Sequence, residues 1–303
     1  MHDIVIRSGK VVDGTGKAIR QMDIAIDNGL ITAVGNDIGE GRTEIDASNH
    51  LVTPGFVDVH THYDGQATWD PEMSPSSYHG VTTTVFGNCG VGFAPAQPDS
   101  HDWLIQLMEG VEDIPGAALA EGIEWNWETF PEYLDALEKM PRVMDIATQV
   151  PHGSVRAYVM GERGARNEDP TADDLIAMAQ IVQEGIEAGA LGFTSSRTML
   201  HRALDGEPVP GTFAGAEELI AMGRAVADAG GGVVEVASDI GLGGLEGNFG
   251  SDIDWMRALA NDYGLTVTYA LNQADRHPQQ WRELLELSSA PIDGDGKVIA
   301  QVA

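Results

Sequence analysis

The sequence predicts an α/β fold: a TIM-like (β/α)8 barrel, incomplete in this chain, that follows a small β-layer. Two observations support this prediction. Near the N-terminus, apolar and polar residues alternate with a period of two, which is typical of strands with one buried face. From Phe56 onward, short apolar runs alternate with helical patterns, as in a parallel α/β fold.

The first segment has a strand pattern with a turn signal in its middle. Ile4 and Ile6 alternate with Val5 and Arg7 in a period of two, and the apolar residues of 22–26 alternate with Asp23, Ala25 and Asp27. Asn28-Gly29, which follows, is a strong hairpin signal. A further strand-like stretch runs through Ile45 to residue 52. We therefore expect residues 1–54 to form an N-terminal β-sandwich segment or ribbon, and residues 55–303 to form the barrel.

The second segment contains seven strand candidates, at residues 56–60, 81–87, 144–150, 190–195, 233–237, 266–271 and from 297 to the C-terminus. The clearest helix follows Pro170: Thr171 can cap it, Asp174 sits three residues later, and one apolar face carries Leu175, Met178, Val182 and Ile186. Two more helices are expected at 216–229 and 254–262.

A closed barrel of this kind needs eight strands, whereas only seven strand patterns are present. We therefore expect a barrel truncated before strand eight, with exposed strand edges, a tendency to aggregate and negligible activity of the chain alone. A doubly wound open sheet is the alternative. It is disfavoured because no Gly-x-Gly-x-x-Gly turn follows an early strand.

Charge and cysteine content narrow the classes of function. The 17 basic and 47 acidic side chains give a formal net charge of −30, which repels nucleic acids and anionic lipid surfaces and is typical of a solvated acidic surface. One cysteine forms no intrachain disulfide, and no apolar run is long enough to span a membrane. We expect a cytoplasmic protein that acts on a small molecule rather than on nucleic acid or membrane; the oligomeric state is left open.

The sharpest motif is His60-Thr61-His62 at the end of the first barrel strand. In an extended chain, residues i and i+2 point to the same side, so both imidazoles can converge on one metal ion. Barrel enzymes keep their active sites at this end of the strands. A pair of ordinary surface or core histidines is the alternative.

Cys89 follows the second barrel strand, between Asn88 and Gly90. A thiolate at this position is a good zinc ligand, and the neighbouring glycines allow close backbone approach. The alternative is a buried hydrophobic cysteine. A nucleophilic role ranks lower because no histidine partner pattern is evident.

Polar groups also gather at the end of the fourth strand. Ser195, Arg197 and His201 suit recognition of a carbonyl and a carboxylate, with Arg197 as the clamp of a substrate carboxylate. The alternative is a polar loop in which Arg197 pairs with a local acid.

These motifs, in this order and after this β-layer, resemble the amidohydrolase superfamily. Residues 8–14 and 31–35 look like its N-terminal β-layer, and residues 54–62 look like its first barrel strand. Residues 62–66, 87–90 and 189–197 more narrowly resemble the N-acyl-D-amino-acid deacylase (D-aminoacylase) branch.

The resemblance implies one or two zinc ions held by His60, His62 and Cys89. Deacylases place a further histidine after the fifth strand and another after the sixth; residues 234–239 and 268–272 of this chain contain none, and Glu235 is a possible replacement ligand. The family's proton-transfer aspartate follows the eighth strand, beyond residue 303, so the resemblance implies no catalytic residue of that kind within this chain.

The implied activity is hydrolysis of a linear C–N amide bond, with an N-acyl-D-amino acid as substrate. A cyclic-amide hydrolase, like hydantoinase or dihydroorotase, is one alternative, although such enzymes usually carry a carboxylated lysine on the fourth strand and residues 190–196 contain no lysine. A non-catalytic scaffold or inactive fragment is the other, because fold alone does not establish function.

Overall fold

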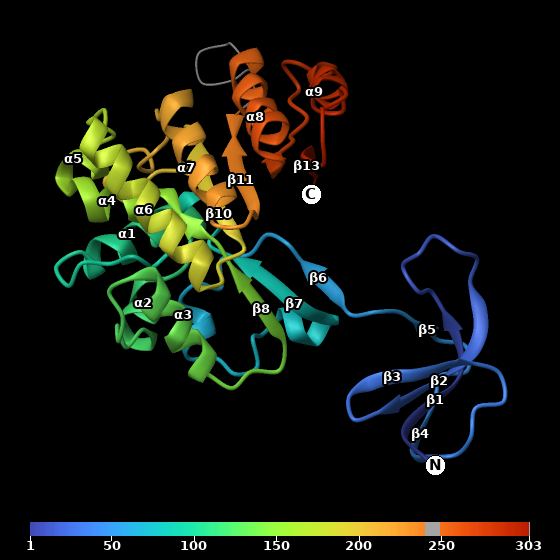
Figure 1. Ribbon diagram of the computed structural model, residues 1–303. Helices are drawn as coiled ribbons and strands as arrows, with labels where there is room; N and C mark the ends of the chain where they lie inside the picture. Colours follow the sequence, from blue (N-terminus) through green and yellow to red (C-terminus); the bar gives the residue numbers. More distant parts are fainter. Residues whose placement is uncertain (240–248, 303) are drawn as a thin grey trace. The chain divides into compact units, whose positions relative to one another are not determined.

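The computed structural model describes residues 1–239 and 249–302 of the chain. By its internal contacts the chain divides into two compact units, Met1–Phe56 and Val57–Ala303. Figure 1 draws both units and labels most of their strands and helices.

The first unit is one five-stranded sheet, with the strands β1 (His2–Val11), β2 (Arg20–Asp27), β3 (Leu30–Gly35), β4 (Gly41–Asp46) and β5 (Leu51–Val52). β1, β2 and β3 pair antiparallel, whereas β4 and β5 pair parallel to β1. The predicted hairpin is confirmed: Asn28 and Gly29 join β2 to β3 with φ of 52° and 76°, the positive values that a two-residue hairpin turn requires.

All seven stretches predicted as barrel strands are strands in the structure. They are β6 (Phe56–Asp58), β7 (Val81–Phe86), β8 with β9 (Asp145–Thr148, Val150–Pro151), β10 (Gly192–Arg197), β11 (Val233–Ser238), β12 (Thr266–Ala270) and β13 (Lys297–Gln301). The strands lie side by side in chain order, β6-β7-β8 in one sheet and β9 to β13 in the other. Since β7 pairs parallel with β8, and β9 to β13 pair parallel in turn, the architecture is that of a TIM-like barrel with seven of its strands described.

Helices connect successive strands of this unit: α1 (His101–Glu112), α2 (Gly116–Gly122), α3 (Phe130–Lys139), α4 (His152–Met160), α5 (Glu162–Ala165), α6 (Ala172–Ala188), α7 (Ala216–Asp228), α8 (Phe249–Tyr263) and α9 (Gln280–Ser288). The predicted cap of α6 is confirmed, because Thr171 and Asp174 form a reciprocal capping box. Met178, Val182 and Ile186 bury its apolar face. No helix in the described part of the chain is long and apolar enough to cross a membrane.

Side chains alternate between the barrel interior and the helix layer along each strand. The strand register places Glu235 of β11 opposite Thr194 of β10 and Thr268 of β12, so these three polar residues share one layer. Glu235 and Thr268 line a cavity of about 380 Å³ together with residues of β7 and β13, which identifies this face as the barrel interior. Ser195 and Arg197, one residue out of step with Thr194, belong to the opposite face of β10.

Candidate metal centre

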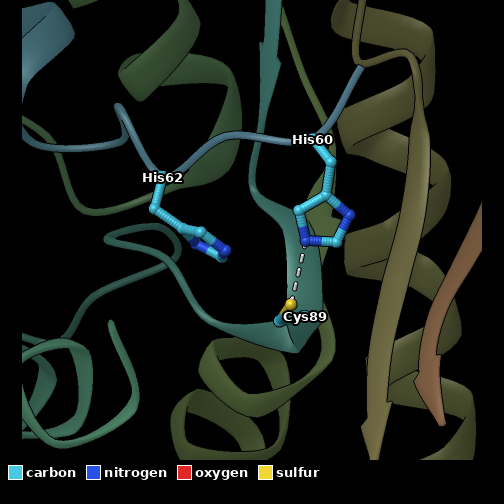
Figure 2. A group of neighbouring side chains, drawn as sticks. All are labelled: His60, His62 and Cys89. Atoms are coloured by element: carbon cyan, nitrogen blue, oxygen red, sulfur yellow. Dashed lines mark hydrogen bonds between the residues drawn. The ribbon is translucent and has the colours of Figure 1, made fainter. Parts of the chain in front are cut away.

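His60 and His62 lie in the segment that follows β6, beside the thiol of Cys89 (Figure 2). The Nε2 atom of His60 is 3.2 Å from Sγ of Cys89, and the two imidazole rings lie 5.6 Å apart between centroids. One nitrogen of each ring and the sulfur all lie within 4.8 Å of one another. Three donors at this spacing can converge on one ion, and nitrogen and sulfur are the ligands that zinc prefers.

The turn that carries Cys89 has an unusual backbone. Cys89 itself has a φ of 57°, in the left-handed region, where a non-glycine residue costs roughly 1–2 kcal/mol. Gly87 and Gly90 are also left-handed, and a Cβ on Gly87 would lie 2.4 Å from the carbonyl oxygen of Gln149. The glycines therefore let the turn pack against the next strand, and the strained Cys89 aims its thiol at His60.

Acidic groups surround this thiol. Burial raises the pKa of Cys89 well above its usual range, and the nearby carboxyl groups of Glu235, Glu112 and Asp64 raise it further. Burial also raises the pKa of Glu235 and of Asp64 to about 8 each. A cluster of buried acids around a thiol favours a bound cation, which would offset their mutual repulsion and stabilise the thiolate.

His62 faces Glu112, the last residue of α1. The Nε2 atom of His62 lies 3.2 Å from Oε1 of Glu112. Burial lowers the pKa of His62 to about 3, and burial raises the pKa of Glu112 to about 7. Because burial disfavours the charged form of both groups, this contact is not a strong ion pair, and both side chains are candidate ligands that face one site.

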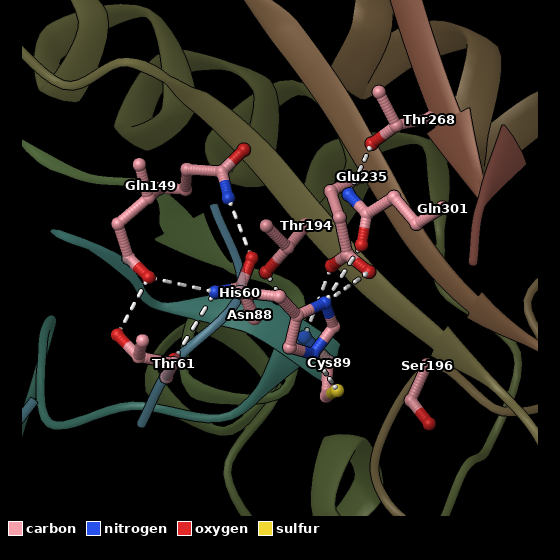
Figure 3. A network of polar contacts seen from close by, with 12 residues as sticks. His60, Thr61, Asn88, Cys89, Gln149, Thr194, Ser196, Glu235, Thr268 and Gln301 are labelled. Carbon is pink, nitrogen blue, oxygen red and sulfur yellow. Dashed lines mark hydrogen bonds and ion pairs between the residues drawn. The ribbon is translucent and has the colours of Figure 1, made fainter. Parts of the chain in front are cut away.

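Glu235 lies behind the cluster and not among the candidate ligands. Its Oε2 atom accepts a hydrogen bond of 3.0 Å from the backbone N–H of Cys89, and its Oε1 atom is 3.8 Å from Nδ1 of His60 (Figure 3). Since His60 turns its other nitrogen, Nε2, toward Cys89, the carboxylate is on the far side of the ring. Glu235 belongs to neither group of donors whose ligand atoms lie within 4.8 Å of one another, so its role as a replacement ligand stays a prediction. What the structure shows is that β11 directs Glu235 into the barrel interior, where one of its oxygens holds the backbone of Cys89.

Two predicted substrate-binding residues point away from this cluster. Ser195 is fully buried and its hydroxyl lies 2.9 Å from Nδ1 of His152. Arg197 is paired with Asp252 of α8 through a 2.9 Å contact of its Nε atom, and it also binds the carbonyl oxygen of Ala214. Both expectations are corrected for one reason: odd-numbered residues of β10 face the helix layer. The structure instead contains the alternative interpretation of Arg197, an ion pair with a local acid.

His201, the third predicted substrate-binding residue, lies beside Cys89, and its role in substrate binding stays a prediction. Its ring nitrogen, Sγ of Cys89 and a carboxylate oxygen of Glu112 lie within 4.8 Å of one another. Sequence reasoning missed Glu112 altogether. The available signal was weak: a carboxylate at the C-terminal end of the helix after the cysteine strand, where the helix dipole disfavours negative charge.

The residues present fit a metal ion. Among the described residues, the buried side-chain atoms His62 Nδ1, Asp64 Oδ2 and Glu235 Oε1 lie around the cluster without a hydrogen-bond partner. Unpartnered buried polar atoms are costly, and they gather where an ion would supply the missing interaction. A larger cavity of about 1010 Å³ between α1, α4 and the loop before α7 contains none of the candidate ligands. We therefore place the candidate site at the cluster.

Comparison with known proteins decides the family. The model of the amidohydrolase family matches residues 43–302. The chain belongs to the amidohydrolase family. This confirms the resemblance seen in the motifs of His60 and Cys89.

Sequence relatives of the chain include a D-aminoacylase. An uncharacterised protein of Mycobacterium tuberculosis is 34% identical over 225 residues, which cover 70% of this chain and 36% of that protein. D-aminoacylase of Alcaligenes xylosoxydans xylosoxydans is 32% identical over 195 residues, which cover 64% of this chain and 37% of that enzyme. The matched region is thus little more than a third of the length of either relative.

Solved structures similar to this chain also include deacylases. A D-aminoacylase described as having a binuclear metal centre superposes with a TM-score of 0.78 at 26% identity, covering 100% of this chain and 58% of that chain. The N-acyl-D-glutamate deacylase of Bordetella bronchiseptica, in complex with zinc and a phosphonate mimic of the tetrahedral intermediate, superposes with a TM-score of 0.74 at 25% identity, covering 99% and 58%.

Proposed function

We propose that this amidohydrolase chain binds zinc and belongs to an enzyme that hydrolyses the amide bond of N-acyl-D-amino acids. The observation that supports this most is the convergence of His60, His62 and Cys89 within 4.8 Å, in a barrel similar to those of D-aminoacylase and N-acyl-D-glutamate deacylase. Both of those enzymes are named for this class of substrate.

In this proposal His60, His62 and Cys89 hold the ion. A bound zinc ion activates water for attack on a carbonyl carbon and polarises the carbonyl oxygen. The chain's own contribution is to fix the ligands: Gln301 Oε1 accepts a 2.9 Å hydrogen bond from Nδ1 of His60, which leaves the lone pair on Nε2 for the metal. Glu235 holds the backbone of Cys89 in the strained turn.

A cyclic-amide hydrolase remains the weaker proposal. Cyclic-amide hydrolases usually carry a carboxylated lysine on the fourth strand, whereas β10, with the sequence GFTSSR, contains no lysine. A cysteine beside the two histidines is instead part of the resemblance to deacylases. We therefore favour the linear amide.

Binding of a phosphonate that mimics the tetrahedral intermediate of an N-acyl-D-amino acid tests the proposal without requiring turnover. The zinc-loaded protein should bind the phosphonate tightly, because transition-state mimics bind far more tightly than substrates at a competent site. It should bind the D form more tightly than its L enantiomer, because the proposed substrate derives from a D-amino acid. His60→Asn should abolish binding, whereas His79→Asn, at an exposed histidine, should not. Equal binding of the two enantiomers, or no binding by the zinc-loaded protein, would overturn the proposal.

A further inference from the structure

Two side chains beside Cys89 belong to neither of the motifs that predicted the metal centre. Glu112 ends α1, and His201 lies in the loop after β10. Each offers one ligand atom within 4.8 Å of the other and of Cys89 Sγ. We propose that Cys89, Glu112 and His201 form a metal position of their own, next to the one formed by His60, His62 and Cys89.

This proposal rests on the proposed metal-dependent function and adds the ligands that the chain otherwise lacks. Deacylases, which the chain resembles, place histidines after the fifth and sixth strands, whereas residues 234–239 and 268–272 of this chain contain none. One oxygen of Glu235, the candidate replacement, accepts a hydrogen bond from the backbone of Cys89, and Glu235 belongs to neither group of converging donors. The second set of donors therefore comes from α1 and from the loop after β10.

The donor set suits a divalent transition metal. Thiolate sulfur, imidazole nitrogen and carboxylate oxygen are the three ligand types that zinc accepts, and three protein ligands with an open fourth position are typical of catalytic zinc sites. The Ser196 hydroxyl lies 3.2 Å from Nδ1 of His201. In the tautomer that donates from Nδ1 to this hydroxyl, Nε2 carries the lone pair that a metal requires.

The charge environment of Glu112 also calls for a cation. Its carboxyl group sits at the C-terminal end of a twelve-residue helix, where the helix dipole is negative. The same group lies close to Asp113 and to the acid-rich surroundings of Cys89. The histidine in contact with Glu112 is His62, another ligand candidate. A metal ion beside Glu112 would compensate this repulsion.

Close packing fixes the two elements in place. A Cβ on Gly110 of α1 would lie 2.6 Å from the carbonyl oxygen of Arg202 and 2.7 Å from the carbonyl carbon of Ala203. The absence of a side chain at Gly110 therefore lets the loop that carries His201 press against the helix that carries Glu112. Two donors from distant parts of the sequence are thereby held at one place before any ion binds.

Zinc stoichiometry after equilibrium dialysis, measured by elemental analysis, tests the proposal on the whole chain. The wild-type protein should bind two equivalents, and Glu112→Gln and His201→Asn should each bind one. Glu109→Gln on the same helix and His79→Asn at an exposed site are matched controls that should keep two. Circular dichroism and thermal melting establish that every variant is folded.

Cobalt provides a second readout that does not depend on activity. In Glu112→Gln the sulfur-to-cobalt charge-transfer band should persist, because Cys89 still serves the His60 and His62 position, while the d–d bands lose the contribution of the second ion. Two equivalents retained in both Glu112→Gln and His201→Asn would overturn the proposal, as would a single wild-type equivalent that neither variant removes. If two ions bind but the phosphonate does not, the proposed function fails and this inference stands; if the phosphonate binds and both variants keep two ions, only this inference fails.

Discussion

The ring of His60 and the side-chain amide of Gln301 are joined by a 2.9 Å hydrogen bond between Nδ1 and Oε1. His60 follows the first strand of the barrel, and Gln301 ends β13. The Nε2 atom of Gln301 in turn donates to Oγ1 of Thr268 on β12. Two distant strands thus set the orientation of one candidate metal ligand, as Figure 3 shows.

Replacing Gln301 with Leu should therefore weaken zinc binding without removing a ligand. Loss of a partner that orients a metal-binding histidine typically costs about 10- to 100-fold in metal affinity. Competition with a chromophoric chelator measures the zinc dissociation constant. Gln106→Leu, at an exposed position of α1, is the control. An unchanged dissociation constant in Gln301→Leu would show that the hydrogen bond plays no part in metal binding.

Arg197→Met should lower stability rather than change substrate selectivity. The substitution leaves Asp252 largely buried without its ion-pair partner, and breaking such a pair costs about 3 kcal/mol. Arg224→Met is the matched control, because its pair with Asp228 is exposed and worth less than about 1 kcal/mol. Urea unfolding measures both. A selective loss of binding to carboxylate-bearing phosphonates in Arg197→Met would restore the clamp role instead.

The buried network of His152 and Glu218 should make the fold sensitive to acid. Burial lowers the pKa of His152, and although burial opposes it, hydrogen bonds from His152 and Arg156 lower the pKa of Glu218. Below about pH 6.5 the unfolded chain takes up a proton that the folded His152 resists, so stability is lost as pH falls, and Glu218 adds to this below about pH 4.5.

His152→Asn tests this pH dependence. Between pH 7.5 and pH 5.5 it should remove up to one proton from the slope of unfolding free energy against pH, at most about 1.4 kcal/mol per pH unit. Urea unfolding at both pH values, with a chelator present, measures the slope. His79→Asn should leave it unchanged, since His79 is exposed. Identical slopes in wild type and His152→Asn would contradict a depressed pKa of His152.

Thr171→Ala should destabilise the protein by about 1 kcal/mol. The hydroxyl of Thr171 accepts a hydrogen bond from the backbone N–H of Asp174 at the start of α6, and alanine cannot replace it. Thermal or urea unfolding measures the loss. Thr53→Ala, at an exposed threonine outside any helix, should change stability by much less. A null result for Thr171→Ala would mean that the start of α6 frays in the native protein.

The sequence predicts those parts of the molecule that depend on local periodicity. The capping box of Thr171, the turn at Asn28 and the seven strand stretches all follow from patterns within a few residues. The pair of His60 and His62 can be predicted for the same reason, because side chains two residues apart on an extended segment point to the same side.

What the sequence does not predict depends on which strand face is buried and on long-range packing. Polar residues throughout β10 give no clue that Thr194 and Ser196 face the barrel while Ser195 and Arg197 face the helices. Glu112 reaches the site only because α1 packs against the loop of His201 at Gly110, a contact between residues that are about ninety positions apart in the sequence. For this reason the sequence pattern suggests substrate binding by Ser195 and Arg197, which lie on the helix-facing side of β10, and gives no indication of Glu112 as a candidate ligand.

X-ray absorption at the zinc edge tests the central claim, that this chain holds a metal ion through Cys89 and histidine. The zinc-loaded protein should show one sulfur shell at about 2.3 Å together with nitrogen or oxygen neighbours at about 2.0–2.2 Å, since these are the bond lengths of zinc to thiolate, imidazole and carboxylate. The sulfur shell should vanish in Cys89→Ser, because Cys89 is the only cysteine of the sequence. A spectrum of the wild-type protein that contains only nitrogen and oxygen neighbours would contradict the account.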